Sequence, residues 1–456
     1  MSATGGSDDA ASEGLTTRGG GLRGRLRGIS SALPLVAAGA VASLSGLLTT
    51  IVVARVLTTR GYGVLIELFS LFLVLSMPGS ALLVGVVRRI TAWDTSRQDG
   101  LVVPWLRRVH RVGEAAVVVL AVIAFLLRGA LAHALSLGGY GGLVEILTAG
   151  GVWVLVSIDR GALQARQDYK GVSLNLVLEG VVRAVAVIGL AAAAGVEGAA
   201  TGVLVTEVVT AVHARVRIRR TLTRGPVPGE VHPADIGRVP PHLAADVAVA
   251  FASLGLLALL QNGDVLILGS RAPHASGFYA AVSVPAKALV FWALTLANYM
   301  LPEAAIRWHA GGHALRQLGH TVVLLLPPCA LLLALAVFVP RQLLTAVFGA
   351  KYAVASAAFA PLVLAMTALA LTVVLATYVL GAGRRWVAPL LGAGATALLL
   401  ATWAAGGVPR ATARADLAVQ AALLGALGLA FAAMHHRLRH APVTAESPSP
   451  AGSGIA

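Results

Sequence analysis

The feature that most constrains this chain is a series of long apolar blocks, each bounded by a short polar turn or an arginine-rich stretch. Charged residues make up only 12% of the sequence and the mean hydropathy is +0.82, so most of the chain cannot cover a water-soluble surface. A helix that crosses a bilayer core needs about 20 apolar residues, and it must satisfy its own backbone hydrogen bonds there. The sequence therefore predicts an all-α polytopic membrane protein.

About twelve transmembrane helices are predicted, and two of them, 143–159 and 198–214, approach the lower length limit. The expected spans are 31–57, 63–87, 113–136, 143–159, 172–194, 198–214, 242–268, 278–301, 319–339, 353–380, 386–405 and 416–434.

Residues 1–30 are rich in Gly, Ser and Asp and then become basic, which is typical of a disordered cytoplasmic tail. A basic start before an apolar run can also be a signal peptide, and Ala38-Gly39-Ala40 resembles a cleavage site. The apolar run continues to Leu57, however, far beyond the apolar core of a signal peptide. We therefore predict an uncleaved first helix.

The basic residues are distributed unevenly between alternate loops. With the N-terminus inside, the cytoplasmic segments carry 25 of the 35 Lys and Arg residues. The positive-inside rule then predicts a multi-pass protein of the cytoplasmic membrane with both termini in the cytoplasm. The net charge of +15 thus comes mostly from basic residues that set the orientation in the membrane. No segment is long enough to form a soluble face that binds nucleic acid. The single cysteine, Cys329, excludes an intrachain disulfide.

Similar motifs recur at offsets of 217, 217 and 212 residues, the last between Tyr140 and Tyr352, and divide the twelve helices into two groups of six. Tyr62 and Tyr279 each follow a Gly-containing turn, and Leu163 and Leu380 each follow an expected helix; both pairs are 217 residues apart. Because six is an even number of membrane crossings, both halves enter the membrane from the same side. This describes a parallel repeat about an axis along the membrane normal. Glycine–aromatic pairs that simply mark helix ends at the interface are the alternative. The expected division is a tail 1–30, a six-helix bundle 31–214, a cytoplasmic linker 215–241, a second bundle 242–434 and a tail 435–456.

At these junctions the chain resembles the Wzx-type polysaccharide-biosynthesis flippases, lipid-linked oligosaccharide flippases of the multidrug/oligosaccharidyl-lipid/polysaccharide exporter superfamily. The similar motifs run in order from about residue 31 to 400. They are Ala54-Arg55-Val56-Leu57 before Gly61-Tyr62-Gly63, Gly85-Val86-Val87-Arg88-Arg89, Leu163-Gln164-Ala165-Arg166-Gln167-Asp168-Tyr169, Asn262-Gly263-Asp264-Val265-Leu266-Ile267-Leu268-Gly269, Gly277-Phe278-Tyr279-Ala280-Ala281 and Phe348-Gly349-Ala350-Lys351-Tyr352.

The resemblance implies a MATE-like V of two six-helix bundles around a central cavity that moves an undecaprenyl-diphosphate-linked glycan from the inner to the outer leaflet. Alternating access is the expected mechanism, and polysaccharide polymerase and glycosyltransferases are the expected protein partners. Lipid II flippases of the same superfamily usually have fourteen helices. The twelve expected here make a peptidoglycan role less favoured.

Three basic residues are candidates for binding the diphosphate, because a charge inside a membrane usually faces a cavity or a partner. Arg183 follows Glu179 by four residues, so an internal ion pair is as plausible as a guanidinium that binds diphosphate. Lys287 has no acidic neighbour within four positions and lies too deep to snorkel easily. Arg55, near the outer end, is the weakest of the three.

Three acidic residues, Asp264, Glu67 and Glu207, are candidates for coupling transport to an ion, because a buried carboxylate can carry a proton. Stabilisation of helix contacts is the more common role, and Glu67 could equally favour the N-terminus of its helix. Asp264 is the best of them, because Gln261 and Asn262 lie beside it on an otherwise apolar helix.

No enzyme signature is present, and we expect no catalytic residue, cofactor or metal site. The chain has no P-loop, and His309 and His313 have no glutamate between them. Two alternatives to a flippase remain open: a cation-coupled drug or metabolite antiporter on the same scaffold, and a non-transporting membrane scaffold of a polysaccharide-assembly complex.

Overall fold

The computed structural model describes residues 34–35, 37–95, 98–139, 141–222, 241–309, 315–381 and 384–440. The expected tail 1–30 and most of the expected linker and C-terminal tail lie outside these residues. Within them the regular structure is helical, and eleven helices are long and apolar enough to cross a membrane. The prediction of an all-α polytopic protein is confirmed.

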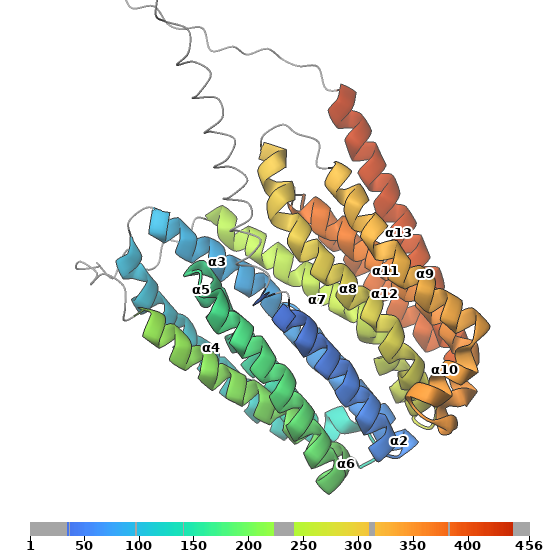
Figure 1. Cartoon of the computed structure of the whole chain (residues 1–456). Coiled ribbons are helices and arrows are strands. Elements are labelled where there is room, and N and C mark those ends of the chain that lie inside the picture. The colour runs from blue at the N-terminus through green and yellow to red at the C-terminus, as the bar shows by residue number, and fades with distance from the viewer. Residues whose placement is uncertain are drawn as a thin grey trace, which may run out of the picture.

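The first six-helix unit, which we call the first lobe, ends at Leu222 (Figure 1). It contains an unlabelled helix Ala37–Val56, then α2 (Thr59–Ser76), α3 (Gly79–Thr95), α4 (Val102–Ala134), α5 (Leu143–Ala165) and α6 (Tyr169–Leu222).

The second lobe begins at Pro241. Figure 1 shows it to the right of the first lobe. It contains α7 (Pro241–Arg271), α8 (Ser276–His309), α9 (Leu315–Phe338), the short α10 (Pro340–Val347), α11 (Ser356–Gly381), α12 (Val387–Ala404) and α13 (Pro409–His440). A 3-10 helix at Ala350–Ala355 leads into α11.

One of the expected spans is interrupted in the structure, and two others are joined. The expected span 63–87 is made by α2 and α3 together, which are separated at Met77 and Pro78 because proline cannot continue the hydrogen-bond ladder. The expected spans 172–194 and 198–214 are the two arms of α6, which fold back at Ala194 and Gly195. Gly195 adopts φ of 62°, a conformation that glycine reaches without a steric penalty. With the two arms counted separately, the described residues contain twelve spans.

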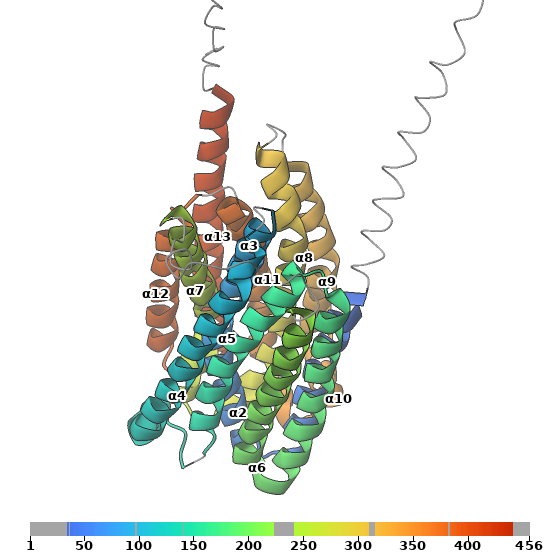
Figure 2. The ribbon, with the colours of Figure 1, turned by 90° about the vertical axis from the view of Figure 1, so that its left-hand side faces the viewer.

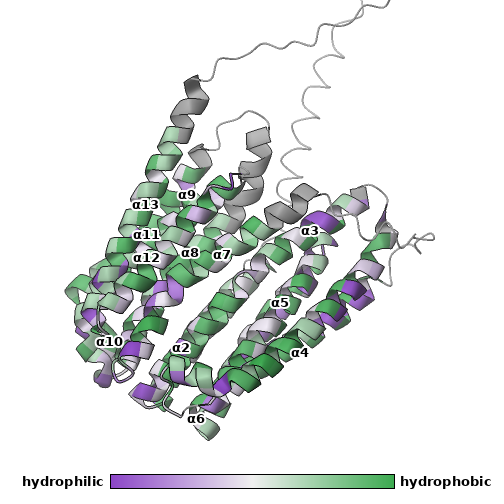
Figure 3. Ribbon diagram, turned by 180° about the vertical axis from the view of Figure 1, so that it is seen from behind, coloured by the Kyte–Doolittle hydropathy of each residue, from purple (hydrophilic) through white to green (hydrophobic). Residues whose placement is uncertain are grey.

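Several helices continue beyond the predicted membrane edges. α4 begins at Val102, eleven residues before its expected span, and α6 continues to Leu222, so the expected linker 215–241 begins inside a helix. α13 begins at Pro409 rather than at 416. Figure 3 shows hydrophobic residues over the middle of the bundle and hydrophilic residues gathered toward helix ends, as a bilayer requires.

The parallel repeat is visible in where the helices begin. Thr59, the first residue of α2, and Ser276, the first residue of α8, are separated by the same 217 residues as Tyr62 and Tyr279. Both tyrosines therefore lie in the first turn of the corresponding helix, and both are fully buried. The lobes meet through α2, which packs on α7 and α8, and through α3, which packs on α7.

Candidate functional site

The two lobes are joined where α2 and α8 begin, around the side chain of Arg60. One guanidinium nitrogen, Nη1, donates to the carbonyl of Pro273 at 2.8 Å and to Ser276 Oγ at 2.9 Å. The other, Nη2, donates to the carbonyl of Ser136 in the first lobe. Since Ser136 Oγ in turn donates to the Ser270 carbonyl at 3.0 Å, three chain segments are connected at this end.

The contact around Arg60 has a symmetric counterpart. Under the 217-residue offset, Arg60 corresponds to Gly277 and Ser276 to Thr59, and Gly277 lies directly against the Thr59 carbonyl. A Cβ atom at Gly277 would collide with that carbonyl, and a Cβ at Gly63 would collide with Ser276 Oγ. The helix starts of α2 and α8 thus approach each other as the two halves of a pseudo-twofold interface.

A second set of contacts closes the same end. Arg55 of the first lobe donates to the carbonyls of Ala346 at 2.6 Å and Val347 at 3.0 Å. In the opposite direction, Lys351 Nζ donates to the Leu57 carbonyl at 2.9 Å. The Tyr352 hydroxyl donates to the Ala54 carbonyl, also at 2.9 Å. Tyr62 packs edge-on against Tyr352 with ring centroids 5.6 Å apart. We call the end formed by residues 54–63, 270–277 and 346–352 the sealed end. The structure places Arg55 in this seal, away from Arg183 and Lys287.

The second lobe contains a buried charged cluster built from α7, α8 and α13. Lys287 Nζ lies 3.1 Å from Asp264 Oδ1 and 3.5 Å from Asn262 Oδ1. The other oxygen of Asp264 accepts a hydrogen bond of 2.8 Å from the Tyr279 hydroxyl. Asp264 is fully buried and Lys287 is 6% exposed. Tertiary packing therefore supplies the acidic partner that the local sequence around Lys287 lacks.

A second carboxylate, Asp416 on α13, belongs to the same cluster. It is fully buried and within electrostatic range of both Asp264 and Lys287. One of its oxygens accepts from Gln420 Nε2 at 3.1 Å, and the other has no hydrogen-bond partner. Within the described residues only Asp264 forms an ion pair with Lys287, so the cluster carries one surplus negative charge when both carboxyl groups are ionised, and a proton or a cation could balance it.

The first lobe contains a balanced network of two arginines and two glutamates. Glu179 accepts from Arg160 at 2.6 Å and from Arg183 at 2.7 Å, and Arg183 also donates to Glu207 at 2.7 Å. Arg160 further donates to Asn175, which ties the first arm of α6 to the Thr210 carbonyl of the second. The internal ion pair expected for Arg183 is present, and 24% of its side chain remains exposed.

Glu67 occupies a third position, beneath the seal. It is 1% exposed, lies 3.4 Å from Arg60 Nη1 and packs directly against Gly269 of the second lobe. Its second oxygen has no hydrogen-bond partner. Glu67 is therefore a link between the lobes, whereas Asp264 and Glu207 each belong to the interior of one lobe.

The six sequence candidates consequently fall into three places. Arg55 and Glu67 lie at the lobe contact, Arg183 and Glu207 pair in the first lobe, and Lys287 and Asp264 pair in the second. In the part of the chain that the structure describes, no group of three His, Cys, Asp or Glu side chains could hold a metal ion.

The sequence reading missed Arg60, Arg160 and Asp416. Arg160 directly follows the expected span 143–159, and Asp416 is the first residue of the expected span 416–434. The signal that could have found Asp416 is Gln420, one turn later on the same helix face, which makes a polar pair on an apolar helix.

No protein-family model matches the chain, and no curated protein matches it. Solved structures do. The chain is similar to an inward-facing MATE family multidrug resistance transporter of the MOP superfamily, with a TM-score of 0.65, 13% identity, and coverage of 89% of this chain and 99% of that one. It is also similar to the lipid II flippase MurJ in an inward closed conformation, with a TM-score of 0.67, 10% identity, and coverage of 87% of each chain. This chain has the fold of MOP-superfamily transporters.

A third similar structure, a MATE protein in complex with MaL6, has a TM-score of 0.59, 17% identity, and coverage of 90% of this chain and 96% of that one. All three cover nearly the whole chain, so the likeness includes both lobes. The V-shaped arrangement of two repeated bundles that the motifs imply is confirmed.

Proposed function

We propose that this protein is a flippase that moves a polyprenyl-diphosphate-linked oligosaccharide between membrane leaflets by alternating access. The observation that carries the proposal is the seal between the lobes. Its hydrogen bonds join the lobes where α2 and α8 begin, through one pseudo-symmetric contact and a few carbonyl acceptors. Hydrogen bonds of this kind can break when the lobes move apart, although one apolar cluster also continues from the first lobe into the second.

The charged clusters supply the chemistry that the proposal needs. A diphosphate headgroup must be stabilised by fixed cations. The partly buried Arg183 and the buried Lys287 both lie well inside their helices. Both are held by carboxylates in the structure. Protonation of Glu207 or Asp264 would leave the neighbouring cation available to the diphosphate, which couples substrate binding to proton binding.

The choice of substrate is supported by the ordered motifs around Arg55, Asp264 and Lys351, which resemble those of oligosaccharide flippases. Positive-inside topology adds that loading takes place at the cytoplasmic face, opposite the sealed end. Polysaccharide polymerase and glycosyltransferases are the proposed neighbours in the membrane.

The test is a flipping assay in proteoliposomes. A polyprenyl-diphosphate oligosaccharide is incorporated, and the fraction that becomes accessible to an added glycosidase is measured over time. A lost charge-assisted contact costs roughly 1.5–3 kcal/mol, so Lys287→Gln and Arg183→Gln should each weaken headgroup binding by roughly 10- to 150-fold. Arg128→Gln is the matched control, because Arg128 stacks on Phe125 of α4 outside both clusters. Normal flipping by both cluster variants would refute the basic-cavity mechanism.

A cation-coupled antiporter is the second candidate, favoured by the surplus carboxylate at Asp264 and Asp416. The same proteoliposomes distinguish it: an antiporter accumulates a cationic dye when a proton or sodium gradient is imposed, and leaves the lipid-linked oligosaccharide where it was. A scaffold would do neither, and alanine at Arg183 and Lys287 would leave the assembly of polysaccharide unaffected.

A further inference from the structure

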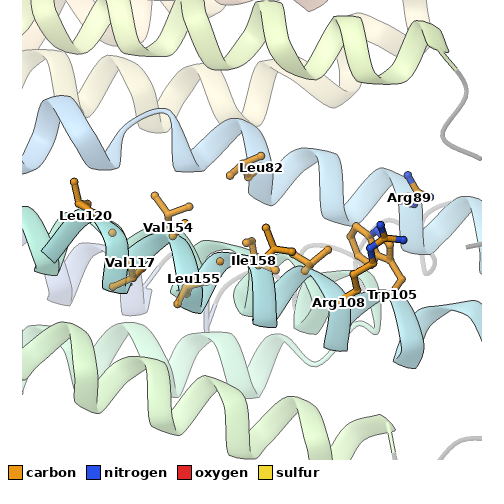
Figure 4. Close-up of a pocket in the computed structure, with 14 residues that line it drawn as sticks. Leu82, Arg89, Trp105, Arg108, Val117, Leu120, Val154, Leu155 and Ile158 are labelled. Carbon is orange, nitrogen blue, oxygen red and sulfur yellow. The ribbon is translucent and has the colours of Figure 1, made fainter. Parts of the chain in front are cut away.

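A groove in the first lobe lies away from both charged clusters and from the lobe contact. It has a volume of about 590 Å³ and is bounded by α3, α4 and α5. Most of its lining is aliphatic, including Leu82, Val117, Leu120 and Val154 (Figure 4). α4 lies at the periphery of the lobe (Figure 2), and its side chains Val112 and Val118 are more than 60% exposed.

One end of the groove is cationic. Figure 4 shows Arg89, Trp105 and Arg108 gathered there, whereas the labelled aliphatic side chains extend away from them. The guanidinium of Arg89 lies 4.5 Å from the ring centre of Trp93 and 5.2 Å from that of Trp105. Indole rings next to arginines are characteristic of the level of the lipid headgroups.

Within the described residues, neither Arg89 nor Arg108 forms an ion pair with a carboxylate. Arg89 is 8% exposed, and its Nε atom has no hydrogen-bond partner. Since both arginines line the groove, a phosphate at this end would supply the negative charge that neither arginine receives from a described carboxylate.

The length of the groove fits one leaflet. From Trp105 to Leu120 the axis of α4 rises about 22 Å at 1.5 Å per residue, whereas half of the hydrocarbon core is roughly 15 Å. A headgroup held at Arg89 and Arg108 would therefore lie in the headgroup region, with an acyl chain along Val117 and Leu120.

We propose that the α3–α4–α5 groove is a binding site for an anionic glycerophospholipid, with its phosphate on Arg89 and Arg108 and an acyl chain along the apolar wall. The whole groove belongs to one lobe, so its lipid stays bound while the lobes rock. A transported lipid would have to contact both lobes, which separates this site from the proposed transport path.

Native mass spectrometry of the purified full chain tests the site with two probes, phosphatidylglycerol and phosphatidylcholine. The protein should retain phosphatidylglycerol preferentially. Arg89→Gln combined with Arg108→Gln should weaken that binding about 10-fold or more, since two charge-assisted contacts are lost. The matched control is Arg107→Gln combined with Arg111→Gln, which removes the same number of charges near Arg108 on α4 but from the lining of a neighbouring groove beside Arg215. It should leave the binding unchanged.

A second pair of variants tests the acyl chain independently of charge. Ala116→Trp fills the groove, whereas Ala115→Trp lies on the same exposed helix outside its lining. Only Ala116→Trp should reduce binding of long-chain phosphatidylglycerol, and neither should affect a dihexanoyl analogue. If the Arg89/Arg108 and Arg107/Arg111 double variants lost phosphatidylglycerol binding equally, the proposed site would be wrong. A preference of the protein for polyprenyl phosphate over phosphatidylglycerol would also contradict it. Because the readout is lipid binding, loss of the site and loss of flipping activity are distinguishable.

Discussion

Lys287 on α8 and Asp264 on α7 form an ion pair of 3.1 Å in the buried core of the second lobe. Removing one partner of a buried pair leaves an uncompensated charge, which costs about 3–5 kcal/mol, whereas replacing both is far milder. We therefore expect Lys287→Gln and Asp264→Asn each to lower the unfolding temperature of the purified protein, and the double variant to recover most of the loss.

The double variant also separates stability from transport. If Asp264 carries a proton during the cycle, the double variant should be stable and inactive in the flipping assay. Stable protein with normal flipping would show that the pair is only structural. The unfolding temperature and the flipping rate are measured on the same preparation.

In the first lobe, the two glutamates of the network are not equivalent. Glu179 accepts from both Arg160 and Arg183, whereas Glu207 accepts only from Arg183. Glu179→Gln should therefore destabilise the protein more than Glu207→Gln, by about 1.5–3 kcal/mol for the additional charged hydrogen bond. Thermal unfolding in detergent measures both, and an equal effect of the two substitutions would contradict the network.

The membrane spans, the repeat of the two lobes and the resemblance to flippases could be predicted from the sequence, because they depend on composition and on spacing along the chain. Apolar length predicts a membrane helix directly, and the 217-residue offset of Tyr62 and Tyr279 reappears in the starts of α2 and α8. Where the boundaries differ, as at α13, apolar length locates only the part of the helix that lies in the membrane, and the helix itself continues into polar residues.

The partners of the charged residues were not accessible in the same way. Asp264 and Lys287 are 23 residues apart and lie on different helices. Helical periodicity predicts which face of its helix a residue occupies, but it does not predict which other helix packs against that face. Arg183 is the instructive exception: its local partner Glu179 was predicted, but Glu207, on the other arm of α6, was joined to it only by the fold.

The sealed end should open when Arg60 is truncated. Arg60→Ala removes hydrogen bonds to Pro273, Ser276 and Ser136 at once, whereas Arg60→Lys keeps the charge but cannot reproduce the planar fork. The native cysteine is first removed by Cys329→Ala, and a new one is introduced at the seal by Ser270→Cys. The rate at which maleimide labels this cysteine should be lowest with Arg60 present, higher with Arg60→Lys and highest with Arg60→Ala. An unchanged labelling rate would show that the contacts of Gly277, Arg55, Lys351 and Tyr352 hold the seal without Arg60.

Asp168, in the turn before α6, gives a pH-dependent prediction. Hydrogen bonds from Arg217 hold the pKa of its carboxyl below the ordinary value, and the same carboxylate caps α6 through the Gly171 amide at 3.0 Å. A depressed folded-state pKa contributes stability that is fully present above the unfolded pKa of about 3.9 and is lost as pH falls through the folded value. The Arg217 side chain is 39% exposed, so screening limits this contribution to about 1 kcal/mol.

Two substitutions at Asp168 separate its charge from its capping role. Asn caps a helix about as well as Asp, so Asp168→Asn should lose only the ion pair, be less stable than the natural chain at pH 7, and converge with it below about pH 4. Asp168→Ala should lose about 1 kcal/mol more, at every pH, because the cap is gone as well. Unfolding temperatures measured between acidic and neutral pH decide this. Parallel curves for the natural chain and Asp168→Asn would mean that the Arg217 pair contributes nothing in solution.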